Sequence, residues 1–262
     1  MDYKAVELHD GERVDDLMVG HLKVIQHENE FCFSLDAILL SHFVTVRPEV
    51  RVVDLGTGTG VIAFLLTARG AGHVTGLELN PTTADMAARS VLLNQLEGKV
   101  SILRGDLCRV KELLPSEGYE LVVSNPPYRP VKGGYLSSND NVAKARHEVT
   151  ATLQDVIHAA RYLLKYRRGR FAMVHLPERM AEILTAMSQA GIEPKRLRLV
   201  YSSLDKEPVM LLVEGVKGAK PGLRVLPPLV VYKPDGSYSH EILQWYKGDY
   251  VSAGVLTLSE LL

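Results

Sequence analysis

Short apolar runs alternate along this chain with segments whose apolar residues recur at helical spacing. The runs that predict buried strands lie at 51–55, 73–78, 100–104, 119–124, 170–175, 196–202 and 208–214. Helical spacing is clearest at 60–69, 81–95, 150–166 and 178–190. Such alternation predicts a doubly wound α/β fold, with a mostly parallel sheet and right-handed crossovers. Only a short polar stretch, 203–207, separates the last two runs, so these should form an antiparallel hairpin at one edge.

The pattern changes at both ends of this core. We expect residues 1–46 to form an N-terminal cap, 47–216 the α/β core, and 217–262 a C-terminal extension packed on the core. Prolines at both ends of 221–232 argue against a central strand there. The extension also holds a short helical pattern with the only tryptophan, Trp245, which we interpret as a packing residue. With 262 residues and 46% hydrophobic content, the chain can bury a substantial core.

The most informative segment follows the apolar run 121–124 and consists of Asn125, Pro126, Pro127 and Tyr128. An amine conjugated to a ring is a poor nucleophile, and two acceptors that bind its N–H groups would draw the nitrogen toward a tetrahedral geometry. The Asn125 side-chain oxygen and the Pro126 carbonyl could be those acceptors, since a proline has no competing N–H and a fixed φ. Tyr128 would stack on a flat substrate. The alternative is an ordinary turn, for which asparagine and prolines are also typical.

A glycine-rich loop joins the first predicted core strand to the first predicted core helix. Gly56, Gly58 and Gly60 alternate with threonines, and Val61 stands where a dinucleotide-binding fingerprint has its third glycine. Glu78 ends the next strand, where its carboxylate can accept hydrogen bonds from both ribose hydroxyls of a nucleoside. Dehydrogenases share that acidic residue. Loop, acidic residue and Asn-Pro-Pro-Tyr in this order favour S-adenosylmethionine over a nicotinamide dinucleotide.

Charge is unevenly distributed along the chain, although its net charge is −1. Residues 1–128 hold 11 Lys and Arg against 18 Asp and Glu, whereas residues 129–224 hold 17 against 9. Such asymmetry can mark a nucleic-acid-binding face, so we expect cations of the basic half, Lys195, Arg196 and Arg198 among them, to contact phosphates. The alternative is a solvated surface, with the cations between 161 and 170 placed at a helix end where they suit the dipole.

Other features favour a cytoplasmic enzyme that needs neither metal nor membrane. No apolar run approaches the roughly 18 residues that span a bilayer. The acidic stretch 1–16 has no apolar core of the kind a secretory signal carries. The two cysteines, Cys32 and Cys108, lack metal-ligand spacing, and we interpret both as reduced packing residues. Nothing in the pattern indicates an oligomeric state.

Taken together, the motifs resemble class I S-adenosylmethionine-dependent methyltransferases of the amino-methylating branch. The closer resemblance, over about residues 14 to 232, is to the bacterial valine-tRNA adenine-N6 methyltransferase family, which modifies the adenine next to the anticodon. The segments that carry it are 52–60, 77–80, 105–107 and 124–128, with 33–40, 146–148, 194–198 and 213–218 for the closer match. The resemblance implies a Rossmann-like seven-stranded sheet, S-adenosylmethionine as cofactor, and an RNA substrate, most simply a tRNA.

It also implies roles for individual residues. Asp106 would accept a hydrogen bond from the adenine amine of the cofactor, although a helix N-cap explains it too. Asp54 would organise the glycine loop and the amino end of the cofactor. Phe33 and Asp36 would close over the methionine part, unless Phe33 is a core anchor. Asn94, within a predicted helix, is expected to be structural. The predicted cofactor-binding set is Phe33, Asp54, Gly56, Gly58, Gly60, Glu78, Asp106, Leu107 and Asn125.

Two other functions remain open at this stage. The same tetrapeptide serves methyltransferases of glutamine in release factors and of adenine in DNA; the basic half argues against a small peptide target. A noncatalytic cofactor-binding or RNA-binding module is the second possibility, but mere binding would not need two acceptors aimed at an amine. Methylation of an adenine turned out of an anticodon loop and stacked on Tyr128 is therefore the function that the sequence favours.

Overall fold

The structure is a computed structural model and describes residues 6–28, 35–127 and 151–246. Its main sheet has nine strands in the order β10-β8-β9-β7-β6-β3-β4-β5, with β11 also paired to β8. The strands are β3 (Arg51–Leu55), β4 (His73–Glu78), β5 (Val100–Arg104), β6 (Leu121–Ser124), β7 (Arg170–His175), β8 (Ile192–Tyr201), β9 (Pro208–Lys217), β10 (Arg224–Val225) and β11 (Leu229–Val230). The neighbours among β3 to β7 are parallel, and β9 is antiparallel to both β7 and β8. The predicted doubly wound α/β fold with an antiparallel hairpin is therefore confirmed.

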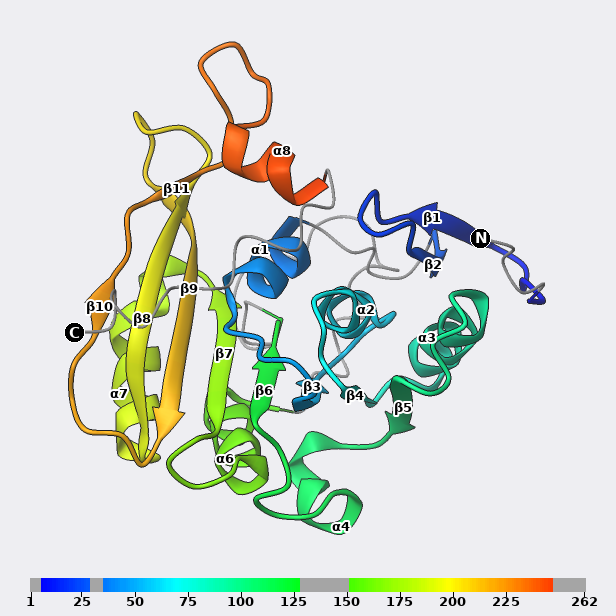
Figure 1. Cartoon of the computed structure of the whole chain (residues 1–262), viewed down its shortest axis with the longest axis horizontal. Coiled ribbons are helices and arrows are strands. Elements are labelled where there is room, and N and C mark those ends of the chain that lie inside the picture. Colours follow the sequence, from blue (N-terminus) through cyan, green and yellow to red (C-terminus); the bar gives the residue numbers. More distant parts are fainter. Residues whose placement is uncertain (1–5, 29–34, 128–150, 247–262) are drawn as a thin grey trace, which may run out of the picture.

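Helices cover both faces of this sheet (Figure 1). One hydrophobic cluster joins the sheet to α1 (Leu35–Phe43) and α2 (Val61–Ala68), and a second joins it to α6 (Leu153–Leu163) and α7 (Met180–Gln189). Successive residues of one strand point to opposite faces of the sheet, so Val52 belongs to the first cluster and Val53 to the second. The remaining helical elements are α3 (Pro81–Leu93), η1 (Leu107–Arg109), α4 (Val110–Leu113), η2 (Pro177–Arg179) and α8 (His240–Tyr246).

The predicted strands all form, but the hairpin strands are longer than the pattern indicated. β8 begins at Ile192, four residues before the predicted start, and β9 continues to Lys217. Pro194 lies within β8, and a register shift between Pro194 and Arg196 lets the pairing continue past the proline. The extension adds β10 and β11, two residues each, on the outer side of β8. They are peripheral strands, in agreement with the expectation that prolines exclude a central one.

The N-terminal part contains an antiparallel hairpin that the apolar pattern did not reveal. β1 (Glu12–Asp16) pairs with β2 (Lys23–His27) in a separate two-stranded sheet. Polar side chains of α3 hold it: Ser90 Oγ accepts the Ile25 N–H at 2.9 Å, and the Asn94 amide bonds both backbone groups of Lys23, at 2.8 and 2.6 Å. The hairpin thus depends on residues about 70 positions away, which explains why local spacing missed it. It also confirms that Asn94 is structural.

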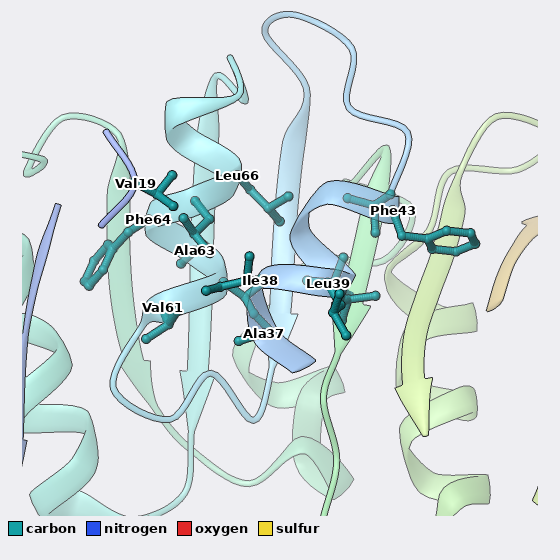
Figure 2. Close-up of a cluster of buried hydrophobic side chains, with 14 of the residues drawn as sticks. Val19, Ala37, Ile38, Leu39, Phe43, Val61, Ala63, Phe64 and Leu66 are labelled. Carbon is teal, nitrogen blue, oxygen red and sulfur yellow. The ribbon is translucent and has the colours of Figure 1, made fainter. Parts of the chain in front are cut away.

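Helix α1 packs directly on α2, the helix that follows the glycine loop (Figure 2). Ile38 and Leu39 of α1 are buried in the same cluster as Val61 and Ala63 of α2. Arg69, just beyond α2, donates to the backbone oxygens of Ser41 and Val44 and so caps the end of α1. These contacts fix α1 beside the loop that the sequence singled out. In the described part of the chain, no helix has the length and apolar character required to cross a membrane.

The predicted division at 46 and 216 stays a prediction. The described elements do show that the segment after Lys217 contacts the sheet, because β10 and β11 pair with β8. Arg198 of β8 holds this segment as well: its guanidinium binds both carboxylate oxygens of Glu241 in α8, at 2.6 and 2.8 Å. Its Nε also donates to the Pro227 oxygen at 2.9 Å.

Candidate functional site

The predicted site residues at the ends of β3, β4 and β6 lie together where the strand order of the sheet reverses. β3 lies between β4 and β6, and the three strands are parallel, so their carboxyl ends share one edge. Leu55, the last residue of β3, is level with Leu77 on one side and Ser124 on the other. The chain leaves β3 toward β4 and leaves β6 toward β7, in opposite directions along the sheet. In open α/β sheets this switch point forms the crevice in which ligands bind.

The glycine loop at this edge combines open space with tight packing. Gly56, Gly58 and Gly60 all have positive φ, at 72°, 57° and 91°, a conformation that other residues rarely adopt. A Cβ on Gly56 or Gly58 would meet no atom within 4 Å, whereas one on Gly60 would lie 2.8 Å from the Phe64 ring. The first two glycines therefore border free space beside the backbone, and the third allows α2 to begin close to the loop. A direct cofactor contact by Gly60 stays a prediction.

Asp54 is fully buried at the end of β3, and its two oxygens differ. Oδ2 accepts a 2.6 Å hydrogen bond from the Thr57 hydroxyl, while Oδ1 has no hydrogen-bond partner among the described residues. Burial raises the Asp54 pKa to about 7; the nearby charge of Glu78 adds to the rise and the Thr57 hydrogen bond opposes it. A buried, unpaired acceptor is costly unless a ligand completes it. An ammonium group or an ordered water would do so.

Glu78 links the end of β4 to the loop. Its Oε2 accepts the Gly58 N–H at 2.8 Å, and its Oε1 accepts the Asn80 N–H at 2.9 Å. Each carboxylate oxygen has a second lone pair, so both can still accept from a ligand. Such a carboxylate, held from behind by two backbone N–H groups, suits a diol such as a ribose.

Asp106 lies next to Glu78 because the Gly105 N–H donates to the Glu78 carbonyl at 2.8 Å. One of its oxygens, Oδ1, accepts the Cys108 N–H at 2.8 Å and caps η1, so the N-cap interpretation is confirmed. The cap uses a single oxygen, which leaves Oδ2 for the predicted adenine amine. The ligand role of Asp106, and that of the half-buried Leu107 beside it, stay predictions.

Asn125, Pro126 and Pro127 continue directly from β6 beside the glycine loop. Ser124 Oγ donates to the Leu55 carbonyl at 2.9 Å and ties the ends of β6 and β3 together. Asn125 and Pro126 are half-buried and Pro127 is exposed. The structure thus brings the proposed amine acceptors to the same edge as Asp54 and Glu78. Tyr128 and Phe33 lie outside the described residues, and so do 146–148.

Asp36, which was expected at the methionine part of the cofactor, is buried at the start of α1. Its Oδ1 accepts the backbone N–H of Ala37 at 2.8 Å. This contact is local and serves the first turn of the helix. A contact between Asp36 and a ligand stays a prediction.

Several cations of the basic half have partners within the protein. Arg196 Nη1 donates to Thr45 Oγ1 at 2.7 Å and lies 3.4 Å from the buried carboxylate of Glu214, which also pairs with Arg170 at 2.8 Å. Lys195 Nζ donates to the Lys220 oxygen at 3.2 Å, and Arg198 binds Glu241. The alternative, cations at a helix end, holds for Arg161, which lies in the last turn of α6; Lys165 to Arg170 follow this helix, which ends at Leu163. Phosphate contacts by these cations stay predictions.

The sequence pattern did not identify two residues that support the predicted site, Thr57 and Gly76. Thr57 is buried, and its hydroxyl is the partner of Asp54. Gly76, in β4, has no room for a side chain, because a Cβ would lie 2.7 Å from Thr57 Cγ2. The available signal was an aspartate followed three residues later by a threonine in a tight loop, together with a glycine inside an apolar strand, which often marks close approach of a neighbour.

Comparisons with known proteins agree with this geometry. Residues 23–182 match the family model described as the methyltransferase small domain. A tRNA1(Val) (adenine(37)-N6)-methyltransferase of Porphyromonas gingivalis is 28% identical over 228 residues, covering 83% of this chain and 88% of that protein. One of the same description from Aeromonas salmonicida is 28% identical, covering 80% and 86%. The solved structure of a predicted O-methyltransferase of Agrobacterium tumefaciens superposes with a TM-score of 0.66 at 23% identity, covering 81% and 96%, and shows the fold alone.

Proposed function

Because this chain belongs to the methyltransferase small domain family, we propose that it methylates N6 of an adenine in RNA, specifically in the anticodon loop of a tRNA. The protein is an enzyme that transfers methyl groups, and S-adenosylmethionine is its donor. The choice of adenine and of tRNA draws on the similar proteins of Porphyromonas gingivalis and Aeromonas salmonicida, whose descriptions name that reaction.

The observation that carries the proposal is the position of Asn125 and Pro126 beside the glycine loop. The register of β3 and β6 places Ser124 level with Leu55, so Asn125 and Gly56 begin two neighbouring loops at the same end of the sheet. A methyl donor bound against the glycine loop and a substrate amine bound at Asn125 would then lie next to each other at one edge of the sheet. Methyl transfer to nitrogen needs this proximity more than it needs a strong acid or base.

The cofactor fits the residues that the crevice offers. The open space beside Gly56 and Gly58 admits a ligand close to the backbone, and Glu78 offers two acceptors to a ribose. Asp54 Oδ1, buried and unpaired among the described residues, suits the amino end of the methionine part, directly or through a water. Asp106 keeps one oxygen for the adenine amine. When bound, S-adenosylmethionine supplies an electrophilic methyl group on a positively charged sulfur.

The chain's own residues would prepare the amine. The Asn125 side-chain oxygen and the Pro126 carbonyl would accept hydrogen bonds from the two N–H groups of the amine. These bonds favour the tetrahedral nitrogen of the transition state over the planar nitrogen of the ground state. The Ser124 hydrogen bond to Leu55 keeps this segment in place without contacting the substrate. Tyr128 would stack on the adenine ring, as the sequence predicts. A proton leaves the nitrogen after transfer.

One assay separates this function from its rivals. The protein is incubated with S-adenosylmethionine labelled in the methyl group and, in separate reactions, with tRNA, ribosomal RNA, DNA and a release factor. We expect label in tRNA, released by nuclease digestion as N6-methyladenosine, and label incorporated at least about 100-fold more slowly with Asn125→Ala. Label in release-factor glutamine or in DNA adenine would assign the alternative substrate, and no transfer to any pool while the cofactor binds would indicate a noncatalytic module.

A further inference from the structure

Three tyrosines of the C-terminal extension contact one another in series, the first two stacked and the third tilted against the second. The rings of Tyr232 and Tyr238 lie 5.3 Å apart at 16°, and those of Tyr238 and Tyr246 lie 5.7 Å apart at 34°. Burial, together with the neighbouring tyrosines, raises the Tyr246 pKa to about 12. The inner two rings pack against the core cluster, but Tyr232 is 40% exposed. The stack therefore presents one rigid aromatic ring to solvent.

This ring lies at the same edge of the sheet as the methyl-transfer site. β8 is antiparallel to β9, which is antiparallel to β7, so β8 runs in the direction of β6 and β7. β11 is parallel to β8, and the Tyr232 N–H donates to the Ser202 oxygen at 3.0 Å, just beyond the end of β8. Two turns, 202–207 and 232–238, extend from this edge near α8 (Figure 1). Tyr232 is thus exposed beyond the carboxyl ends of the strands.

The strand order gives the separation between Tyr232 and the target amine. Three interstrand steps lead from β6 to β8, and β11 is one step further. At about 4.8 Å a step, the ring lies on the order of 14–19 Å from Asn125 along the sheet. That is too far for Tyr232 to touch the methylated base. It corresponds to about four to six stacked nucleotides at roughly 3.4 Å each, a distance within one RNA loop.

Charge near Tyr232 does not favour a purely electrostatic contact. The two turns carry Lys206 and Lys233 but also Asp205, Glu207 and Asp235. Hydrogen bonds within the turns, from Ser203 and Ser237, lower the pKa of Asp205 and Asp235, so both carboxylates stay charged. The acidic groups offset the lysines, and any affinity here must come mainly from the ring. Base stacking on an exposed aromatic works in this way and tolerates any base.

We propose that Tyr232, backed by Tyr238 and Tyr246, stacks on an unpaired nucleotide of the same RNA loop, about four to six stacked nucleotides from the methylated adenine. The inference rests on the proposed function, because it takes RNA as the substrate. An unpaired base in a loop has few stacking partners in the RNA, and an exposed aromatic ring on the protein offers it one. Tyr232 would then be a substrate-binding residue outside the catalytic segment.

The test compares Tyr232→Ala with two matched variants in the full-length protein. Tyr232→Phe keeps the ring, and Tyr166→Ala removes a more exposed tyrosine, 57%, between α6 and β7 at the opposite edge. Fluorescence anisotropy with a labelled tRNA transcript at several salt concentrations gives Kd and its salt dependence. We expect Tyr232→Ala to raise Kd by about 5- to 150-fold with an unchanged log-salt slope, and the two controls to bind as the wild type does. In methyl transfer, KM should rise and kcat at saturating RNA should hold.

Folding is checked by the melting temperature of each variant, and Tyr232→Leu serves as a second test because it keeps apolar contact with Tyr238 without a flat ring. Wild-type Kd for both Tyr232→Ala and Tyr232→Leu, in an enzyme that still methylates tRNA, would overturn this inference and leave the proposed function intact. A wild-type protein that neither binds nor methylates RNA would instead refute the proposed function. A transcript with 5-iodouridine at loop positions should also photocrosslink to the peptide containing Tyr232, and a crosslink confined to other peptides would contradict the assignment.

Discussion

The two halves of the sheet on either side of β6 are built in different ways. In the half formed by β3, β4 and β5, the strands are parallel and five or six residues long, and the groups with chemistry lie in the loops beyond their ends. In the half formed by β7, β9 and β8, the strands pair antiparallel over up to ten residues and carry charged side chains within them. The first half places polar groups in the loops at its strand ends, and the second uses several of its charges in ion pairs within the protein.

Glu214 shows why this difference matters for inferring function from charge. Its buried carboxylate binds Arg170 of β7, Arg196 of β8 and the backbone N–H of Thr45, which follows α1. Three segments separated by up to 169 positions thus meet at one charge. A count of lysines and arginines cannot distinguish such cations from those available to phosphate. The basic half of the chain is therefore a weaker indicator of an RNA-binding face than its net charge suggests.

Replacing Asn125 should produce the largest effect, and mainly on the chemistry. Asn125→Ala removes an acceptor needed as the nitrogen becomes tetrahedral, so kcat should fall by about 10²- to 10³-fold while cofactor affinity changes far less. Steady-state methyl transfer and calorimetry measure the two quantities. The matched control is Asn94→Ala, which breaks the contacts with Lys23 and should lower the melting temperature without changing kcat. Full activity of Asn125→Ala would refute methylation of an amine at this site.

Glu214→Ala should affect stability in the other half. Removing this carboxylate leaves Arg170 and Arg196 without their shared partner; each is about a quarter exposed, so water compensates in part. We expect the free energy of unfolding to fall by about 3 kcal/mol, the lower end for a broken buried ion pair. Urea denaturation gives this value, with Glu112→Ala, from the exposed pair with Arg109, as a control that should change little. An unchanged urea midpoint for Glu214→Ala would show that the cluster is not a stabilising centre.

Glu78→Ala should weaken cofactor binding by about 1.5–3 kcal/mol, the range for a hydrogen bond to a charged group. The loss has two physical sources, the ribose acceptors and the anchor of the Gly58 N–H. Glu78→Gln separates them in part, because the amide can keep one acceptor for the loop while losing the charge. Calorimetry with S-adenosylmethionine measures both variants. Unchanged affinity in Glu78→Ala, or tight binding of a nicotinamide dinucleotide by the wild type, would contradict the assignment of the crevice.

The raised pKa of Asp54 predicts that the stability of the cofactor-free protein depends on pH. Because its folded-state pKa is raised from 3.8 to about 7, the protonated form favours the folded state. The resulting stability is complete below pH 3.8 and is lost as pH rises through about 7, by roughly 1.4 kcal/mol per pH unit in between. Asp54→Asn lacks this titration, so its stability relative to the wild type should increase from pH 5 to 7 and level off above.

Urea denaturation of both proteins at several pH values measures that difference. Burial lowers the pKa of His42 to about 3 and that of His175 to about 4, and both imidazoles titrate in the wild type and the variant alike, so the difference removes them. A difference that does not vary with pH would show that Asp54 ionises normally.

Arg198→Ala should have the smallest effect on stability, and it tests whether Arg198 contacts a phosphate of the RNA. Loss of the bidentate bond to Glu241 should loosen the extension and lower stability by about 1 kcal/mol. If Arg198 is only a structural clamp, the log-salt slope of RNA binding should stay constant. A slope lower by about 1 would show instead that this guanidinium meets a phosphate in the complex. Lys195→Ala provides the comparison, since Lys195 is bonded only to the Lys220 oxygen among the described residues.

The sequence by itself determined the fold class and the edge of the sheet at which the strand-end residues of the predicted cofactor site lie. This was possible because the glycine loop, Glu78, Asp106 and Asn125 each follow a strand with a clear apolar pattern, and parallel strands bring their carboxyl ends to one edge. Each of these residues lies within a few positions of the apolar run that predicts its strand. Their local backbone geometry, such as positive φ at Gly56 and Gly58, also follows from residue type.

Tertiary structure alone decided which polar groups are paired and which remain available. The contacts of Ser90 and Asn94 with the N-terminal hairpin, of Glu214 with three segments, and of Arg198 with α8 join residues 18 to 169 positions apart. The same holds for Asp54 Oδ1, which is buried without a hydrogen-bond partner among the described residues, and for the tyrosine contacts that leave Tyr232 exposed beyond the carboxyl ends of the strands. Such pairings depend on distances and burial in the folded chain, and residue type and spacing do not contain that information.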